Sequence, residues 1–168
     1  HQGFSKSEAK SFTIAPYGLK VFKQRWYVLA QSEYPDGRLL VYSLDRFTEV
    51  ERTDISYTIS SDFDINEYFR SFYGVSSLSN AQPEIVQLRI DASQVKFFRT
   101  LPLHHSQEEI ETTDAYSVFQ YYLVPTFELT KEILSNGPYV EVLLPLSLRE
   151  EIQSKAQKMA EMYKYINL

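Results

Sequence analysis

Apolar and polar residues alternate with a period of two through the first third of the chain. Residues 11–59 are rich in Val, Tyr, Phe and Thr, and short runs of them are separated by turn residues. The turn residues are Pro16, Gly18, Lys23-Gln24 and Pro35-Asp36-Gly37. This pattern predicts short strands joined by hairpins. About five such strands would close into a small SH3-like or Sm-like β-barrel over residues 1–60, without a helix between 20 and 50.

The pattern then changes to that of a helix with signals at both ends. Asp64 and Glu67 have the spacing of a capping box, and Gly74 is suited to end a helix after Tyr73. A polar run rich in Ser, Asn and Pro follows. We therefore expect residues 61–82 to form a connecting helix and a linker between two domains.

Beyond Pro83 strand and helix patterns alternate in the order βαββαβ. The expected strands are 84–90, 108–112, 116–124 and 139–144, and the expected helices are 91–100 and 126–135. This order is that of a ferredoxin-like, split-βαβ unit. The predicted fold class is therefore mainly β plus α+β, with the barrel followed by a ferredoxin-like unit over residues 83–168.

A last helix completes the C-terminal unit. Ser147 and Glu150 have capping-box spacing. Apolar residues then recur at helical spacing: Leu148, Ile152, Ala156, Met159, Tyr163 and Ile166. This apolar stripe must cover either its own domain or a partner subunit.

Composition and charge restrict the possible functions. The chain has 168 residues, is 43% hydrophobic, and contains no cysteine, which excludes disulfides, thiolate metal sites and a cysteine nucleophile. No apolar run approaches the roughly 20 residues that span a bilayer, and the first residues lack a signal-peptide core. No membrane association is therefore expected, and the predicted location is cytoplasmic.

The net charge of −5 is unevenly distributed. Residues 1–60 carry eight Lys/Arg against seven Asp/Glu, whereas residues 61–168 carry nine against fifteen. General nucleic-acid binders usually have a strongly basic domain. A site for an anion is therefore expected to be local and to lie in the first third of the chain.

No pattern indicates catalysis, a metal or a cofactor. His104 and His105 are adjacent, and neighbouring residues of an extended chain point to opposite sides, so both are not expected to bind one metal. They are expected instead to lie in a polar loop whose side chains satisfy backbone groups. Neither a nucleophile elbow nor a phosphate-binding glycine loop is present.

A cluster of cationic and aromatic residues remains as the candidate site. Its members are Lys20, Lys23, Arg25, Trp26, Tyr27, Arg38, Tyr42 and Arg46. With a strand period of two, Arg25 and Tyr27 share one face and Trp26 lies on the other. A guanidinium beside an aromatic ring suits phosphates and stacked bases. The alternative is structural: Trp26 lies in the core, and Arg46 is held by Asp45, Glu49 or a carbonyl group.

Two short segments carry a family resemblance. Arg25-Trp26-Tyr27-Val28, followed by Asp45-Arg46-Phe47, resembles a WYL domain, the Sm-like ligand-sensing domain of bacterial transcriptional regulators named for its Trp-Tyr-Leu triplet. Pro16-Tyr17-Gly18-Leu19 agrees with the same pattern. The βαββαβ region is similar to the ferredoxin-like extension that follows WYL domains, so the resemblance covers nearly the whole chain.

The resemblance implies the effector-sensing and dimerising region of a bacterial transcriptional regulator. An upstream winged helix-turn-helix would read operator DNA, the barrel would bind an anionic effector such as a nucleotide or nucleic-acid fragment, and the C-terminal extension would form a homodimer. The family's ligand-face positions correspond to Tyr17, Arg25, Trp26, Tyr27 and Arg46. Together with Lys20 and Tyr42 they are the predicted ligand-binding residues.

Three departures from the family pattern affect this prediction. Val28 replaces the leucine of the triplet, a mild apolar change. Leu40 stands where many relatives have an arginine, and the loss of this cation disfavours a polynucleotide ligand. The chain contains no helix-turn-helix, and the leading strand of the barrel is expected to be truncated at His1. The chain alone is therefore not expected to bind operator DNA specifically. The second hypothesis is a structural or protein-interaction module without a small ligand.

Overall fold

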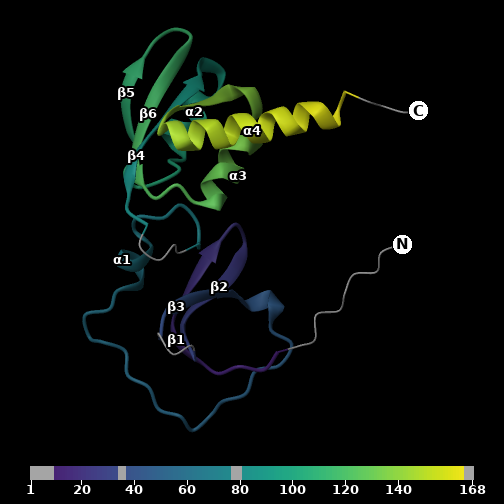
Figure 1. The fold of residues 1–168 in the computed structure, drawn as a ribbon. Coiled ribbons are helices and arrows are strands. Elements are labelled where there is room, and N and C mark those ends of the chain that lie inside the picture. The colour runs from purple at the N-terminus through teal and green to yellow at the C-terminus, as the bar shows by residue number, and fades with distance from the viewer. Residues whose placement is uncertain (1–9, 34–36, 77–80, 165–168) are drawn as a thin grey trace. The chain divides into compact units, whose positions relative to one another are not determined.

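The computed structural model describes residues 10–33, 37–76 and 81–164. The chain divides into two compact units, His1–Ile65 and Asn66–Leu168, each built on one antiparallel sheet (Figure 1). The fold is thus mixed α and β, with β-structure in the first unit and both types in the second.

The first unit contains an open sheet of three strands in the order β1-β2-β3. These strands are Ile14–Phe22, Arg25–Ser32 and Leu39–Ser43. Among the described residues of this unit no other strand closes the sheet into a barrel. A 3-10 helix, η1 (Leu44–Arg46), follows β3, so the expectation of no helix between residues 20 and 50 was wrong for this turn.

The predicted turn at Lys23-Gln24 joins β1 to β2. Both residues have positive φ angles, 45° and 64°, and Phe22 pairs with Arg25 across them, which gives a two-residue hairpin of the type I′ kind. Most of the other predicted turn, residues 35 and 36, lies outside the described residues, as does the expected truncated strand near residue 1.

The predicted helix over 64–73 is much shorter in the structure. Helix α1 covers Ile65–Phe69 only. Phe72 forms a parallel bridge with Val124, and Gly74 has a φ angle of +101°. This pairing with a segment distant in sequence draws the chain out of the helix, and local capping signals could not predict it.

The second unit follows the predicted order of elements. Its strands are β4 (Glu84–Asp91), β5 (Glu108–Thr112), β6 (Tyr116–Leu123) and β7 (Val140–Leu144), and its helices are α2 (Ala92–Thr100), α3 (Phe127–Ser135) and α4 (Leu146–Met162), with a 3-10 turn η2 (Gly137–Tyr139). The four strands are arranged in the order β5-β6-β4-β7, and every neighbouring pair is antiparallel.

The main core lies between this sheet and the helices. Leu88 and Phe119 are directly paired on β4 and β6, and both are buried with Phe98 of α2 and Ile133 of α3. Residues of β4 therefore alternate between a covered face and an exposed one, as the period of two requires.

Side chains cap two helices of the second unit, but not the last one. Asp91 accepts a hydrogen bond from the Ser93 amide and Thr126 accepts one from the Leu129 amide, so both cap their helices. The capping box at Ser147 was wrong, because α4 already begins at Leu146 after Pro145 and has no side-chain cap. Proline is suited to this place, since it has no amide hydrogen to leave unsatisfied.

Candidate functional site

The predicted ligand-binding residues occupy consecutive elements of the first unit. Tyr17 and Lys20 lie on β1, Arg25, Trp26 and Tyr27 on β2, Tyr42 on β3 and Arg46 in η1. The strand register decides which of them can face a common ligand, because directly paired residues share one face of a sheet.

One row of the candidate site runs across all three strands. Lys20 pairs with Tyr27, and Tyr27 pairs with Ser43, so the three side chains lie on the same face. Arg25 is two residues before Tyr27 and belongs to this face too. We call Lys20, Arg25, Tyr27 and Ser43 the cationic row.

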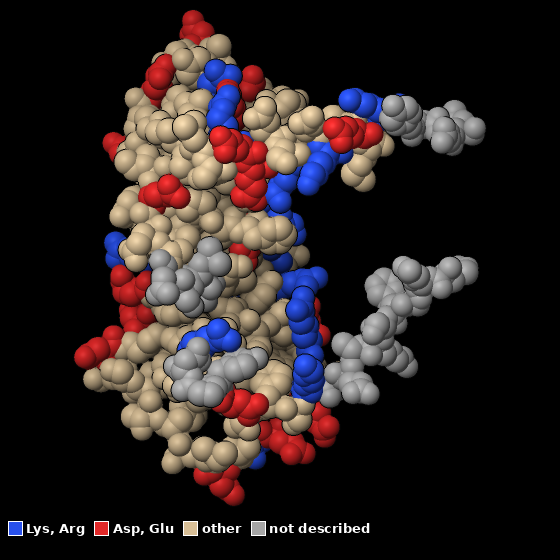
Figure 2. Space-filling model, in the orientation of Figure 1, with Lys and Arg blue, Asp and Glu red and all other residues tan. Residues whose placement is uncertain are grey.

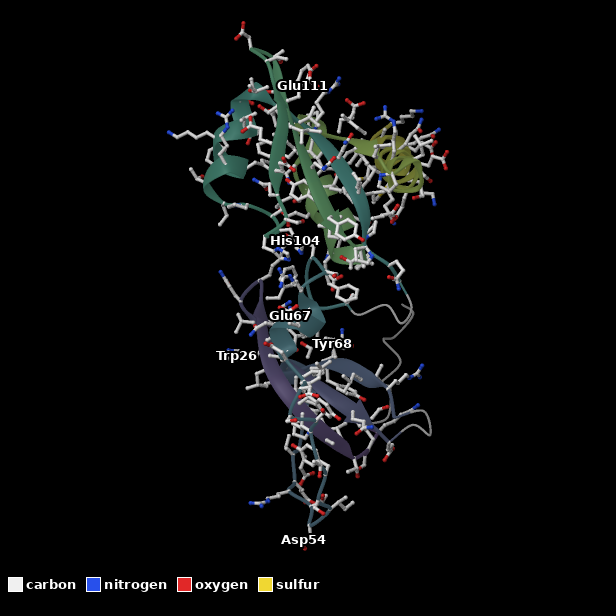
Figure 3. All side chains as sticks on the ribbon, turned by 90° about the vertical axis from the view of Figure 1, so that its left-hand side faces the viewer. Trp26, Asp54, Glu67, Tyr68, His104 and Glu111 are labelled. Carbon is white, nitrogen blue, oxygen red and sulfur yellow. The ribbon has the colours of Figure 1, made fainter. Side chains whose placement is uncertain are left out.

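Trp26 and Tyr42 lie on the opposite face of the same sheet. Val21 pairs with Trp26, and Val28 pairs with Tyr42. Trp26 is 55% exposed and does not belong to the core, so the structural alternative for this residue was wrong (Figure 3). The Tyr42 ring stacks on Phe12 with 5.3 Å between centroids.

Tyr17 has a special place in β1. Pro16 pairs with Ala30 and Gly18 with Leu29, which makes Tyr17 the extra residue of a β-bulge. Its ring contacts Phe63 edge to face at 5.0 Å. The Tyr57 hydroxyl donates a 2.8 Å hydrogen bond to the Pro16 carbonyl. The bulge thus anchors the irregular segment 47–64 to the sheet.

An acid lies beside the cationic row. The Arg25 Nη1 atom donates to Asp45 Oδ2 at 3.0 Å, and Asp45 Oδ1 accepts a hydrogen bond from the Ser43 hydroxyl. The hydrogen bond from that hydroxyl is the largest effect and lowers the pKa of Asp45; desolvation opposes it, and the charges of Arg25 and Arg46 lower the pKa further. Asp45 therefore remains a carboxylate throughout the neutral range.

Arg46 is the second exposed arginine of this corner. Among residues 10–33, 37–76 and 81–164 it has no hydrogen-bond or salt-bridge partner, and the residue that holds Asp45 is Arg25. The expected tie between Arg46 and Asp45 was therefore assigned to the wrong arginine. Sequence reasoning also missed Ser43 as a member of the row, although it could have been found from the alternation that places it on the face of Val41.

The side chains of Lys and Arg lie near one another along one edge of the first unit (Figure 2). Exposed acids surround both units in the same view, in agreement with the net charge of the chain. A cavity of about 390 Å³ in the second unit is lined in part by Glu84, Glu151, Gln82 and Ser147. Its two carboxylates make it unsuited to an anion.

The two adjacent histidines lie together in the second unit. Their ring centroids are 4.1 Å apart, and the Nε2 atoms of His104 and His105 lie 2.7 and 2.9 Å from the Arg70 carbonyl oxygen. The prediction that they satisfy backbone groups is confirmed, but the prediction of opposite orientations was wrong. The loop bends at these residues, so the alternation of an extended chain does not apply.

The described residues include no group of three or more His, Cys, Asp or Glu side chains placed to hold a metal ion. Over the same part of the chain, no helix combines the length and apolar character needed to cross a bilayer.

Comparisons with known proteins identify the two parts of the chain. Residues 1–52 match the WYL domain, and residues 82–160 match the WCX domain. The WYL match falls on the part of the chain that contains the Arg-Trp-Tyr and Asp-Arg segments, as these segments predicted. The two matches together give the order of a WYL domain followed by a WCX domain. No curated protein matches the chain.

This chain is similar to parts of two longer solved structures. One is proteasome accessory factor B/C (PafBC) of Arthrobacter aurescens, with 20% identity and a TM-score of 0.42 over 91% of this chain and 23% of that one. The other is a CRISPR Cas-related protein, with 14% identity and a TM-score of 0.51 over 89% of this chain and 43% of that one. The chain thus spans less than half of each structure, and the second similarity concerns the fold alone.

Proposed function

We propose that this chain is the effector-sensing region of a bacterial transcriptional regulator and that an anionic effector, a nucleotide or a nucleic-acid fragment, binds to the cationic row. The observation that carries the proposal is the alignment of Lys20, Arg25 and Tyr27 on one face, with Arg46 beside them. In this proposal the chain recognises the effector by its charge and not by its base sequence.

The chemistry of the row suits phosphate groups. A guanidinium presents a planar fork of donors that matches phosphate or carboxylate oxygens, and charge-assisted hydrogen bonds are among the strongest in proteins. Tyr27 adds a hydroxyl and a ring face between Lys20 and Ser43. Trp26 and Tyr42 lie on the other face and are proposed to support the sheet or a second contact rather than to touch the same group.

The proposal is tested with Arg46→Ala and a short single-stranded DNA as probe. Binding measured by isothermal titration calorimetry should be lost in Arg46→Ala, while the melting temperature changes by only a few degrees, because exposed substitutions alter stability by about 0.5 kcal/mol. Arg52→Ala is the matched control, since Arg52 is an exposed arginine of the same unit outside the row. Unchanged binding in Arg46→Ala would contradict the proposal.

We further propose that the second unit forms a homodimer through α4. Leu148 is 2% exposed and Ile152 packs on the core, whereas Met159 is 46% and Tyr163 79% exposed on the same apolar stripe. The C-terminal half of α4 runs past the other elements of its unit (Figure 1). A second copy of the stripe would cover this half in a two-fold contact.

Met159→Glu tests the dimer. The wild-type chain should scatter light as a dimer at about 100 μM and Met159→Glu as a monomer, because a carboxylate in the contact would be desolvated. Ser154→Glu places the same charge on the exposed helix surface away from the stripe and should remain dimeric. A monomeric wild-type chain would exclude this contact.

A second function, protein interaction without a small ligand, is favoured by another observation. Leu19, Val21 and Trp26 are 56%, 52% and 55% exposed and lie on one face of the β1-β2 hairpin. The partner in this alternative is the regulator's own DNA-binding domain. Under this alternative the wild-type chain should bind that purified domain but not the DNA probe, and Trp26→Ala should abolish binding of the domain. The effector hypothesis instead requires that the wild-type chain binds the probe and that Arg46→Ala does not.

The remaining parts of the proposal follow from the family. The three-stranded sheet would belong to an Sm-like barrel and the second unit to the ferredoxin-like class. Operator DNA would be read by an N-terminal domain beyond this chain, and the regulator would act in the cytoplasm without catalysis or a cofactor.

A further inference from the structure

The cationic corner already contains an anion. The Asp45 carboxylate lies 3.0 Å from Arg25 Nη1 and also accepts the Ser43 hydroxyl. The side chains of Arg25 and Asp45 are 62% and 52% exposed. Ion pairs this exposed are weak, so a ligand can displace Asp45 from Arg25. Any effector that reaches Arg25 must therefore compete with an acid of the chain itself.

We propose that Asp45 is an internal competitor that makes this site select a terminal, doubly charged phosphate over a singly charged phosphodiester. This inference rests on the proposed function of the cationic row. A monoanion that replaces Asp45 at Arg25 exchanges one charged contact for another. It gains little and is repelled by the displaced carboxylate, which stays nearby because the Ser43 hydroxyl still donates to it.

A phosphomonoester differs because its second charge can be matched at the same corner. Arg46 adjoins Asp45 in η1, is exposed, and has no salt-bridge partner among the described residues. A terminal phosphate has three free oxygens, so it can engage Arg25 and Arg46 at once. The ion pair of Asp45 is formed with Arg25 and not with Arg46, so Arg46 can match the second charge of the phosphate and supply the preference.

The pH dependence should follow the ligand rather than the protein. Asp45 contacts Ser43 and Arg25 and is acted on by the charge of Arg46, and its lowered pKa keeps it ionised between about pH 5 and 8. The second ionisation of a phosphomonoester occurs near pH 6. The preference for a terminal phosphate should therefore be present at pH 7.5 and fall at pH 5.

The experiment compares one oligothymidylate with and without a 5′-phosphate, on the full chain, by fluorescence anisotropy at low salt. The wild-type chain should bind the phosphorylated probe about tenfold more tightly, since one more charge-assisted contact is worth about that factor. Asp45→Asn should tighten binding of the unphosphorylated probe about two- to fivefold and so narrow the preference. Asp54→Asn is the charge-matched control, because Asp54 lies at the tip of the loop formed by residues 47–64, away from the sheet of the first unit (Figure 3).

The outcomes separate this inference from the proposed function. Equal binding of both probes by the wild-type chain overturns the inference and leaves the proposed function of the cationic row intact. The same holds if Asp45→Asn keeps the wild-type melting temperature and does not change the preference for the phosphorylated probe. The wild-type comparison needs no variant and is decisive even if Asp45→Asn fails to fold. Failure of the wild-type chain to bind either probe overturns the proposed function itself.

Discussion

Two glycines with positive φ angles differ in what surrounds them. Gly74 has a φ of +101°, and an added Cβ would lie 2.8 Å from the Cβ and Cγ of Glu128. Gly137 has a φ of +57°, and a Cβ there would meet nothing within 4 Å. Glu128 also accepts the Ser76 amide at 3.1 Å, so it cannot move away without losing this hydrogen bond.

We expect Gly74→Ala to lower the free energy of unfolding by about 2–3 kcal/mol, because backbone strain and a close contact add. Gly137→Ala carries only the cost of a left-handed residue, about 1–2 kcal/mol. Urea denaturation followed by circular dichroism measures both. Equal losses in the free energy of unfolding for the two variants would show that the Glu128 side chain moves away from the added methyl group without destabilising the fold.

The Glu109 carboxylate makes the stability of the second unit depend on pH. Arg99 binds both of its oxygens, at 2.8 and 2.6 Å, and chiefly this lowers the pKa of Glu109 from 4.5 to about 2. The folded-state pKa is depressed, so the pair stabilises the fold above about pH 4.5, and this stability is lost as the pH falls toward 2.

Arg99→Gln should therefore lower the melting temperature at pH 6 by about 3 °C or less, since the partners are partly exposed. Wild type and variant should converge near pH 2. Thermal scans at pH 6, 4 and 2 test this, and the NMR titration of the Glu109 carboxyl should move up in the variant. A constant difference at all three pH values would assign the loss to packing instead.

At the scale of elements, the start of α3 depends on one buried threonine. Thr126 is 1% exposed, its hydroxyl accepts the Leu129 amide at 3.2 Å, and it donates to the Tyr73 carbonyl at 2.8 Å. The cap therefore also holds the segment that follows α1.

Thr126→Val keeps the shape of the side chain and removes both hydrogen bonds. We expect a loss of about 2–3 kcal/mol, more than the typical cap, because buried groups lose their partners. Asp91→Ala, at the exposed cap of α2, should cost about 1 kcal/mol. Chemical denaturation of the two variants measures the difference, and equal losses would mean that the Tyr73 contact adds nothing.

The elements that were predictable are those whose pattern is local. Residues 108–112 form the expected strand, and Asp91 and Thr126 cap the expected helices, because alternation and capping act within a few residues. The helix after Asp64 failed because Phe72 pairs with the distant Val124. In the candidate site, period two separated Arg25 from Trp26 correctly, but only the register shows that Ser43 joins the row and that Asp45 contacts Arg25.

At the scale of the whole molecule, apolar burial is uneven between the units. Among the described residues, the buried hydrophobic side chains of the first unit are Val28, Leu29 and Ala30, whereas the hydrophobic core cluster lies in the second. Burial of apolar area is the main stabilising contribution to folding. The first unit should therefore be the less stable one.

We expect heat to unfold the chain in two steps, the first unit before the second. Trp26 is the only tryptophan and belongs to the first unit, so its fluorescence follows that step alone, while far-ultraviolet circular dichroism also follows α2, α3 and α4. Leu88→Ala, in the core of the second unit, should lower only the later midpoint, because a cavity there costs about 2–5 kcal/mol.

An anionic oligonucleotide bound to the cationic row should raise only the earlier midpoint. At a free concentration of about 100 times Kd the ligand adds about 2.7 kcal/mol, which for a unit of this size moves the midpoint by about 10 °C or more. The shift should shrink as salt is added, because exposed charges are screened. Fluorescence and circular dichroism curves that coincide, with and without the oligonucleotide, would show instead that the units unfold together and that ligand binding stabilises both.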